Sequence, residues 1–194
     1  IDCGGANLRS VQRAVELRNM KTIITNDRDE VSNASFVILP GVGSANRVMN
    51  NLITNNLVPT IKNLTQPVLG ICIGMHVLFD HSEEHDTECM GIIAGNIKKF
   101  KANINTKVPQ MGWNKVTFIN SCEDKLNDHY YFANSYYSPI YDHTLAAAEY
   151  SLPYSAAVQT NNYYGCQFHP EKSSQAGQRF LDYFFNSNED ITRY

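Results

Sequence analysis

The 194-residue sequence shows no strong excess of charge and no long apolar run, and it has a single tryptophan. Its 16 Lys and Arg residues against 19 Asp and Glu residues give a formal net charge of −3. Nucleic acids and anionic membranes are bound through clustered positive charge, so neither is predicted as a partner. No apolar run approaches the roughly 20 residues of a membrane-spanning helix. The first residues do not resemble a signal peptide either.

Cysteine pairs at short spacing are also missing. The five cysteines are an odd number and include no C-x-x-C pair, which argues against a disulfide framework and against a zinc knuckle. Free cysteines without a signal peptide are typical of the reducing cytoplasm, where we expect the protein. We expect no metal and no cofactor. Because the sequence opens at Ile1 rather than at Met, we also expect that the first strand of the fold is truncated.

Short apolar runs alternate with helical patterns in the first half of the chain, which predicts a parallel sheet with helices on both faces. The second half is dominated by strand patterns, with a hairpin turn at Asn161-Asn162, and predicts antiparallel additions. We therefore expect one α/β domain over residues 1–194. Strands are expected at 22–25, 36–39, 68–71, 116–119, 130–132, 155–158 and 163–168. Helices are expected at 8–17, 45–52, 59–64, directly after 74 and carrying Met75, Leu78 and Phe79, and at 176–185. Asn7 and Ser44 are the expected N-caps of the first two helices.

Residues 70–74 (Gly-Ile-Cys-Ile-Gly) lie directly after a buried-strand pattern and directly before a helical one. This is the cysteine form of the G-x-S-x-G nucleophile elbow. A tight strand-to-helix turn needs the flanking glycines because side chains there would clash. The turn raises Cys72 above the sheet edge at a helix N-terminus, where the helix dipole favours a thiolate. A structural cysteine buried in an apolar strand is the alternative.

A cysteine nucleophile needs a base, and His169 is the best placed of the six histidines. It lies in residues 167–171 (Gln-Phe-His-Pro-Glu), at the end of an apolar strand pattern. Glu171 could orient the imidazole by accepting its other N–H, as the third member of a triad. Alone, this motif also fits a surface turn. Combined with the elbow 97 residues upstream, it favours a Cys-His-Glu catalytic site.

Together with Pro40–Gly43, these motifs resemble the class I (triad) glutamine amidotransferases. More narrowly, the chain is similar to the glutaminase subunits of imidazole glycerol phosphate synthases. Each motif alone is modest, but six occur in the right order over nearly the whole chain. The resemblance implies a flavodoxin-like α/β fold with a mixed, mostly parallel sheet. The segments that carry the narrower similarity are 2–11, 109–114, 131–136 and 171–173.

The resemblance also implies the roles of individual residues. Cys72 would attack the side-chain amide of L-glutamine, His169 would transfer protons, and Glu171 would hold the imidazole. The oxyanion hole would comprise the backbone N–H of Ile73 and that of Val42 or Gly43, and each such donor is commonly worth about 10²–10³ in rate. The remaining residues would bind glutamine, with Glu84 on its α-ammonium group. This substrate-binding set is Gly43, His76, Glu84, Asn134 and Ser135.

Four residues depart from the family pattern. His76 stands where glutamine is usual, Asn134 and Gln110 stand where histidine is frequent, and Cys3 stands where an aromatic residue or threonine is frequent. His76 and Asn134 leave open how glutamine is held and how the site communicates with a partner. The expected partner-facing residues are Gln110, Met111, Trp113 and Asn114.

The resemblance implies that ammonia passes to a (βα)8-barrel cyclase subunit, which makes imidazole glycerol phosphate and AICAR in histidine biosynthesis. Three alternatives stay open. One is a paralogue that supplies a sugar-amidating enzyme of surface-glycan synthesis, and another is a stand-alone cysteine hydrolase of γ-glutamyl compounds. The third, a catalytically inactive interaction subunit, is disfavoured by the complete triad.

Overall fold

A seven-stranded sheet forms the centre of the computed structural model, which describes residues 1–4, 8–41, 43–102, 104, 106–119 and 121–187. The sheet pairs residues 68–71 with residues 163–166, so it ties the two halves of the chain together. Its spatial order is β1 (Val37–Gly41), β2 (Val68–Cys72), β11 (Tyr163–Cys166), β10 (Pro153–Thr160), β9 (Thr144–Glu149), β6 (Gln110–Phe118) and β7 (Asp128–Asn134).

The sheet is mixed, as expected, but it is not mostly parallel. Strands β1, β2 and β11 run parallel, and the remaining neighbours pair antiparallel, because most of the late strands follow one another through short connections. Asn161 and Asn162 form the two-residue loop between β10 and β11, and Asn161 has a positive φ of 53°. This confirms the predicted hairpin, since such tight loops favour asparagine at positive φ.

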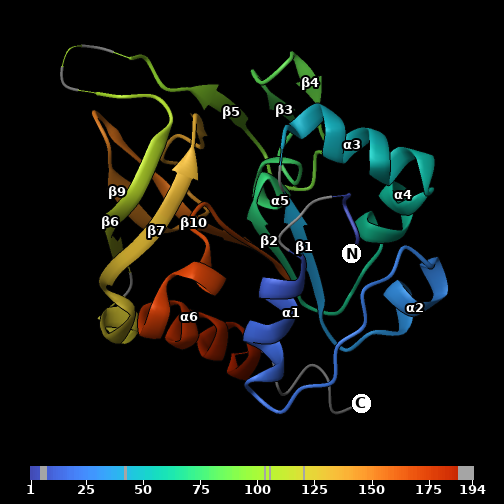
Figure 1. Cartoon of the computed structure of the whole chain (residues 1–194). Coiled ribbons are helices and arrows are strands. Elements are labelled where there is room, and N and C mark those ends of the chain that lie inside the picture. The colour runs from blue at the N-terminus through green and yellow to red at the C-terminus, as the bar shows by residue number, and fades with distance from the viewer. Residues whose placement is uncertain (5–7, 42, 103, 105, 120, 188–194) are drawn as a thin grey trace.

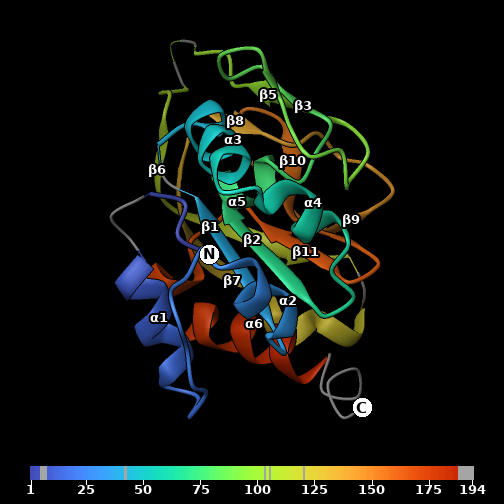
Figure 2. The ribbon, with the colours of Figure 1, turned by 90° about the vertical axis from the view of Figure 1, so that its right-hand side faces the viewer.

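Helices cover both faces of the sheet (Figures 1 and 2). On one face lie α1 (Leu8–Glu16) and α6 (Ser174–Asn186). On the other lie α3 (Ala45–Thr54), α4 (Leu57–Lys62) and the short α5 (Ile73–His76). Ser44 caps α3 as predicted by accepting from the N–H of Arg47. The predicted N-cap of α1, Asn7, lies outside the described residues.

Several shorter elements were not predicted, because two to six residues carry too little periodicity. Helix α2 (Arg28–Asn33) is capped by Asp27 and contacts α4. A second sheet has the order β4 (Thr87–Glu88), β3 (His81–Ser82), β5 (Asn96–Lys99), β8 (Tyr136–Tyr137). Two 3₁₀ helices, η1 (Ser121–Leu126) and η2 (Pro170–Lys172), complete the elements.

The strand expected at residues 22–25 is not a strand. This segment lines an apolar groove of about 670 Å³ together with residues of α1 and β1. A backbone N–H of Asp2 donates to the carbonyl of Thr25, and the N-terminal amine of Ile1 donates to the carbonyl of Ile38. The carbonyl of Ile38 in β1 is thus bonded to Ile1 rather than to residues 22–25.

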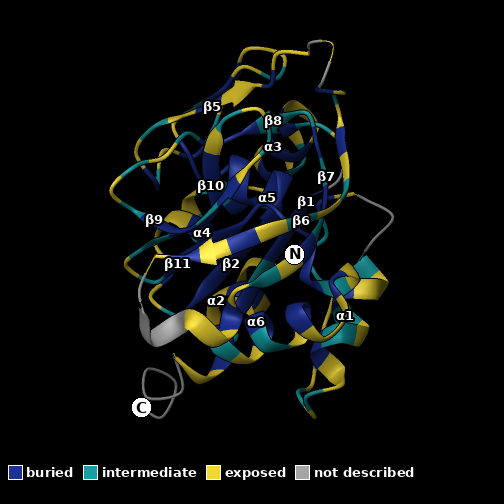
Figure 3. Ribbon diagram, turned by 90° about the vertical axis from the view of Figure 1, so that its left-hand side faces the viewer, coloured by how far each residue is buried: buried dark blue, intermediate teal, exposed yellow. Residues whose placement is uncertain are grey.

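Buried residues concentrate along the sheet, and exposed residues lie on the outer helix faces and loops (Figure 3). Aromatic rings pack the antiparallel half against α6, where Phe168 lies 4.2 Å from Tyr130 and 4.9 Å from Phe180 between ring centroids. Phe168 separates Gln167 from His169, so this packing fixes the segment that carries the predicted base. Within the described residues, no helix is long and apolar enough to cross a membrane.

Candidate active site

The parallel strands β1, β2 and β11 end at one edge of the sheet, and Cys72 is the last residue of β2. Its backbone has φ 55° and ψ −110°, a conformation that non-glycine residues rarely adopt. Strain of this kind costs about 1–3 kcal/mol and persists only where the surrounding structure imposes it. The predicted sharp turn from strand to helix is therefore present, although helix α5 ends at His76, earlier than the pattern indicated.

The flanking glycines permit this turn through close packing. A Cβ atom on Gly74 would lie 1.7 Å from the carbonyl oxygen of Leu39 in β1. A Cβ atom on Gly70 would lie 2.5 Å from the carbonyl oxygen of Gly74. The elbow is thus pressed against β1, which holds Cys72 at a fixed position above the sheet edge.

His169 follows β11 and lies beside Cys72. Its Nδ1 is 2.9 Å from Oε1 of Glu171, and both side chains are almost entirely buried. Burial alone would lower the pKa of His169, but the hydrogen bonds to Cys72 and Glu171, with the charges of both partners, outweigh it and raise the pKa. A charged imidazolium beside the sulfur favours a thiolate, which is the reactive form of cysteine.

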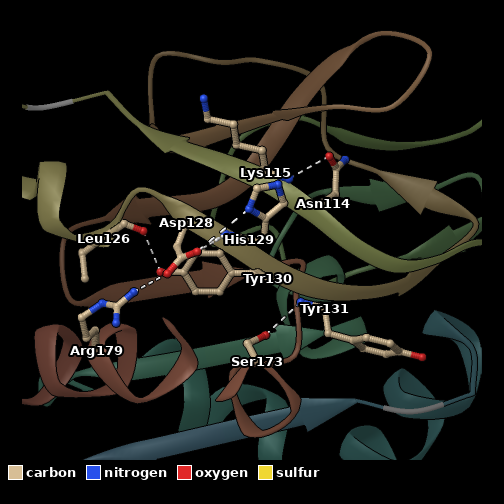
Figure 4. A network of polar contacts seen from close by, with 9 residues as sticks. All are labelled: Asn114, Lys115, Leu126, Asp128, His129, Tyr130, Tyr131, Ser173 and Arg179. Carbon is tan, nitrogen blue, oxygen red and sulfur yellow. Dashed lines mark hydrogen bonds and ion pairs between the residues drawn. The ribbon is translucent and has the colours of Figure 1, made fainter. Parts of the chain in front are cut away.

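The backbone around His169 is anchored to β7 by Ser173, a residue that sequence reasoning did not assign to the site. The hydroxyl of Ser173 donates to the carbonyl of His169 at 2.7 Å. It also accepts from the N–H of Tyr131 at 2.9 Å (Figure 4). The N–H of His169 donates to the carbonyl of Tyr131 at 2.9 Å. These bonds tie the turn that carries the imidazole to β7, the strand at one edge of the sheet.

A cavity of about 270 Å³ opens beside Cys72. It brings together most of the residues predicted for catalysis and substrate binding, although they come from five separate segments of the chain. Glu171 lies behind His169 rather than in the cavity, and Val42 lies outside the described residues. The predicted residues that line the cavity are Gly43, Cys72, Ile73, His76, Glu84, Asn134, Ser135 and His169.

Two polar side chains in this lining have capacity for a ligand. Oε2 of Glu84 accepts from the N–H of Ala45 at 2.7 Å, which fixes the carboxylate at the cavity wall. The amide nitrogen of Asn134 donates to the carbonyl of Tyr136 at 2.9 Å. Its buried Oδ1 has no hydrogen-bond partner among the described residues. A carboxylate and an open acceptor suit a cationic amino group such as the α-ammonium of an amino acid.

Gln167 also reaches Cys72 and was not predicted as a site residue. Its Nε2 lies 3.8 Å from Sγ of Cys72, and its Oε1 lies 2.7 Å from Nε2 of His76. The signal was available in the sequence, because residues 167 and 169 share one face of an extended segment. A polar residue on that face within an apolar run is unusual unless it has a buried partner.

The other described cysteines are poor candidates for a nucleophile. Burial raises the pKa of the Cys3 and Cys89 thiols to about 12. Burial raises the pKa of Cys166 well above its usual range, with smaller contributions from Glu171 and Cys72. A thiol with a raised pKa carries little thiolate near neutral pH. Cys72 is thus the described cysteine whose surroundings fit nucleophilic chemistry.

Strand β6 carries the residues predicted to face a partner, and they alternate in exposure. Met111 and Trp113 are 68% and 54% exposed. Gln110 is instead buried, and its Oε1 accepts from the hydroxyl of Tyr154 at 3.1 Å. Asn114 donates to the carbonyl of Glu149 at 2.9 Å. The alternation of a strand thus turns Met111 and Trp113 outward and Gln110 into the core.

A cysteine elbow at the sheet edge, with histidine and glutamate beside it, defines a cysteine-dependent acyl-transfer site on an α/β fold. Residues 1–188 match the family described as Glutamine amidotransferase class-I. The chain belongs to this family and is a glutamine amidotransferase.

Two related proteins carry names that are more specific than the family description. Imidazole glycerol phosphate synthase subunit HisH of Haemophilus influenzae is 42% identical over 188 residues, covering 95% of this chain and 94% of that protein. Imidazole glycerol phosphate synthase subunit HisH 2 of Legionella pneumophila (strain Paris) is 42% identical over 190 residues, or 96% of each chain.

Solved structures agree with the fold. A glutamine amidotransferase structure superimposes with a TM-score of 0.75 at 13% identity, covering 95% of both chains. A glutamine amidotransferase of Thermotoga maritima gives 0.54 at 14% identity, covering all of this chain and 83% of the other. At these identities the structures show the fold alone, and they confirm the predicted α/β class.

Proposed function

We propose that this chain is the glutaminase subunit of an imidazole glycerol phosphate synthase and that it acts in histidine biosynthesis in the cytoplasm. The observation that carries the proposal is the geometry around Cys72. A strained elbow cysteine, a histidine of raised pKa and a buried glutamate adjoin a cavity with anchored polar groups. The relatives named as subunits of that synthase support the choice of partner and pathway.

The reaction follows from the three side chains. Sγ of Cys72 attacks the side-chain amide carbon of L-glutamine, and a C–S bond forms while the carbonyl oxygen becomes an oxyanion. His169 gives a proton to the amide nitrogen as the C–N bond breaks, so ammonia leaves and a thioester remains. Water then attacks the thioester, with His169 taking its proton, and glutamate and the free cysteine are released. Glu171 keeps the imidazole oriented throughout.

The cavity walls supply the remaining groups. The N–H of Ile73, at the first position of α5, and that of Gly43 or Val42 would stabilise the oxyanion. Gly43 has a φ of 94°, a region that glycine adopts as readily as negative φ, so its backbone can take another peptide orientation without a side-chain clash. Glu84 and Asn134 would bind the α-ammonium group, and Ser135 and Gly43 the α-carboxylate.

Ammonia would pass to a (βα)8-barrel cyclase that docks on the exposed side of β6. Trp113 presents a large ring there, packed edge-on against Tyr131 with 6.3 Å between centroids. Exposed tryptophan with an apolar neighbour such as Met111 is typical of an interface hot spot. In the intact synthase, glutamine hydrolysis and the cyclase reaction would then be coupled.

The Cys72→Ala variant tests this proposal in the reconstituted synthase. Hydrolysis of glutamine should fall to background, because no other described cysteine has a comparable setting. Cyclase product should reappear when ammonium salt is supplied at raised pH, since free ammonia bypasses the glutaminase. Cys89→Ala, a half-buried cysteine outside the cavity, is the matched control and should keep full activity.

Three results would refute the proposal. Glutamate release by Cys72→Ala would show that Cys72 is not the nucleophile. Failure of ammonia to rescue an assembled complex would argue against the ammonia-supply role. Full hydrolysis of γ-glutamyl compounds by the isolated chain would favour the stand-alone hydrolase instead.

A further inference from the structure

A buried chain of hydrogen bonds connects Cys72 through Gln167 to His76. Nε2 of Gln167 lies 3.8 Å from Sγ of Cys72, and Oε1 of Gln167 lies 2.7 Å from Nε2 of His76. Both Gln167 and His76 are 0% exposed. A buried amide and a buried imidazole are costly to desolvate, so their alignment behind the sulfur calls for a physical reason.

The imidazole fixes which way the amide of Gln167 points. An amide can place either its oxygen or its nitrogen toward a neighbour. When Nε2 of His76 carries the proton, it donates to Oε1 of Gln167, and the NH₂ group must then face the sulfur. If the proton were on Nδ1 instead, a buried donor would be left unpaired, because Nδ1 has no hydrogen-bond partner among the described residues. An unpaired buried donor costs about 1–3 kcal/mol, so the Nε2–H tautomer is favoured.

Burial also keeps this histidine neutral. It lowers the pKa of His76 to about 4, against a smaller opposite effect of the hydrogen bond with Gln167. Near neutral pH, His76 therefore supplies one donor and no net charge.

We propose that His76 and Gln167 form a positioning relay for the nucleophile: His76 orients the amide of Gln167 so that its NH₂ group donates to the Cys72 thiolate. This inference rests on the proposed role of Cys72 and revises the expectation that His76 binds glutamine. His76 lines the cavity, but Gln167, which contacts the sulfur, does not. Removing the Gln167 donor should therefore change the rate of reaction at the sulfur and leave glutamine binding nearly unchanged.

Four variants test the relay, with glutamine hydrolysis measured in the complex with the cyclase subunit. Gln167→Leu removes the donor and should lower kcat about tenfold or more with KM within about twofold, since hydrogen bonds to charged groups are worth at least this much. His76→Leu lets the amide turn over and should lower kcat as well. His76→Gln restores an N–H donor and should recover kcat to within about twofold of the native enzyme. Gln159→Leu, which removes a half-buried amide bonded to Tyr164 outside the cavity, is the matched control.

Two further measurements do not use glutamine turnover, and the second needs only the native protein. Alkylation of Cys72 by iodoacetamide at fixed pH should slow in Gln167→Leu and slow further in Gln167→Glu, whose carboxylate would repel a thiolate. Nitrogen NMR shifts of the native protein at pH 7 should show His76 as the neutral Nε2–H tautomer.

The possible failures are distinguishable. Native kcat and alkylation rates in Gln167→Leu, or an Nδ1–H tautomer of His76, would overturn the relay while leaving the nucleophile in place. Equal loss in His76→Gln and His76→Leu would also overturn it. If Cys72→Ala still hydrolyses glutamine, the proposed function itself falls.

Discussion

The buried imidazole of His76 should make the stability of the protein depend on pH in the mildly acidic range. Burial lowers its pKa in the folded chain from 6.5 to about 4. Between these values the unfolded chain binds a proton that the folded chain does not, so stability is lost as the pH falls. From pH 7.5 to pH 5.0, this one group should reduce the free energy of unfolding by about 2 kcal/mol.

The perturbation that isolates this effect is His76→Gln, because glutamine does not titrate and can still donate to Gln167. Urea unfolding at pH 7.5 and pH 5.0 gives the loss of stability for each protein, and the variant should lose about 2 kcal/mol less than the native chain. Other titrating groups, including His169, are common to both proteins and cancel. The control His129→Gln replaces an exposed histidine. Its loss of unfolding free energy between pH 7.5 and pH 5.0 should differ from that of the native protein by less than about 0.5 kcal/mol. Equal pH dependence in the native protein and His76→Gln would refute the reasoning.

Three other outcomes are expected. Glu84→Gln should lower kcat/KM for glutamine by about 10–100-fold, because a charge-assisted contact is worth roughly 1.5–3 kcal/mol. Unchanged kinetics would show that Glu84 does not bind glutamine. Gly74→Ala should destabilise the protein by more than about 3 kcal/mol in urea unfolding, because the added carbon would clash with the carbonyl of Leu39. A variant of native stability would show that the elbow is loosely packed. Trp113→Ala should weaken cyclase binding by about 2 kcal/mol or more in titration calorimetry, and undiminished affinity would place the interface elsewhere.

The local part of the site could be predicted from the sequence, because its chemistry lies in short motifs. Cys72 with its glycines, and His169 with Glu171, each occupy five consecutive residues, and their element boundaries follow from adjacent apolar runs. The strand-helix alternation likewise predicted β1, β2 and the helices on both faces. These features depend on neighbours in sequence, which periodicity and turn chemistry can report.

The remaining features depend on contacts between distant segments. Strand β9 has the sequence Thr-Leu-Ala-Ala-Ala-Glu, whose residues favour a helix by propensity. It is nevertheless a strand, because it pairs with β6 on one side and β10 on the other. His76 was expected at the cavity as a substrate residue. It lines the cavity, but its ring is fully buried and bonded to Gln167, 91 residues away in sequence. Gln110 was assigned to an exposed segment, and the alternation of β6 turns it into the core.

The central claim is that Cys72 performs the attack on glutamine, and covalent labelling tests it most directly. A diazoketone analogue of glutamine alkylates the attacking atom of a glutaminase, and peptide mass spectrometry locates the adduct. In the complex with the cyclase subunit, the label should appear on the peptide that contains Cys72, should be prevented by excess glutamine, and should be absent from Cys72→Ala. A glutamine-protected adduct on any other residue, or complete inactivation without modification of Cys72, would contradict the account.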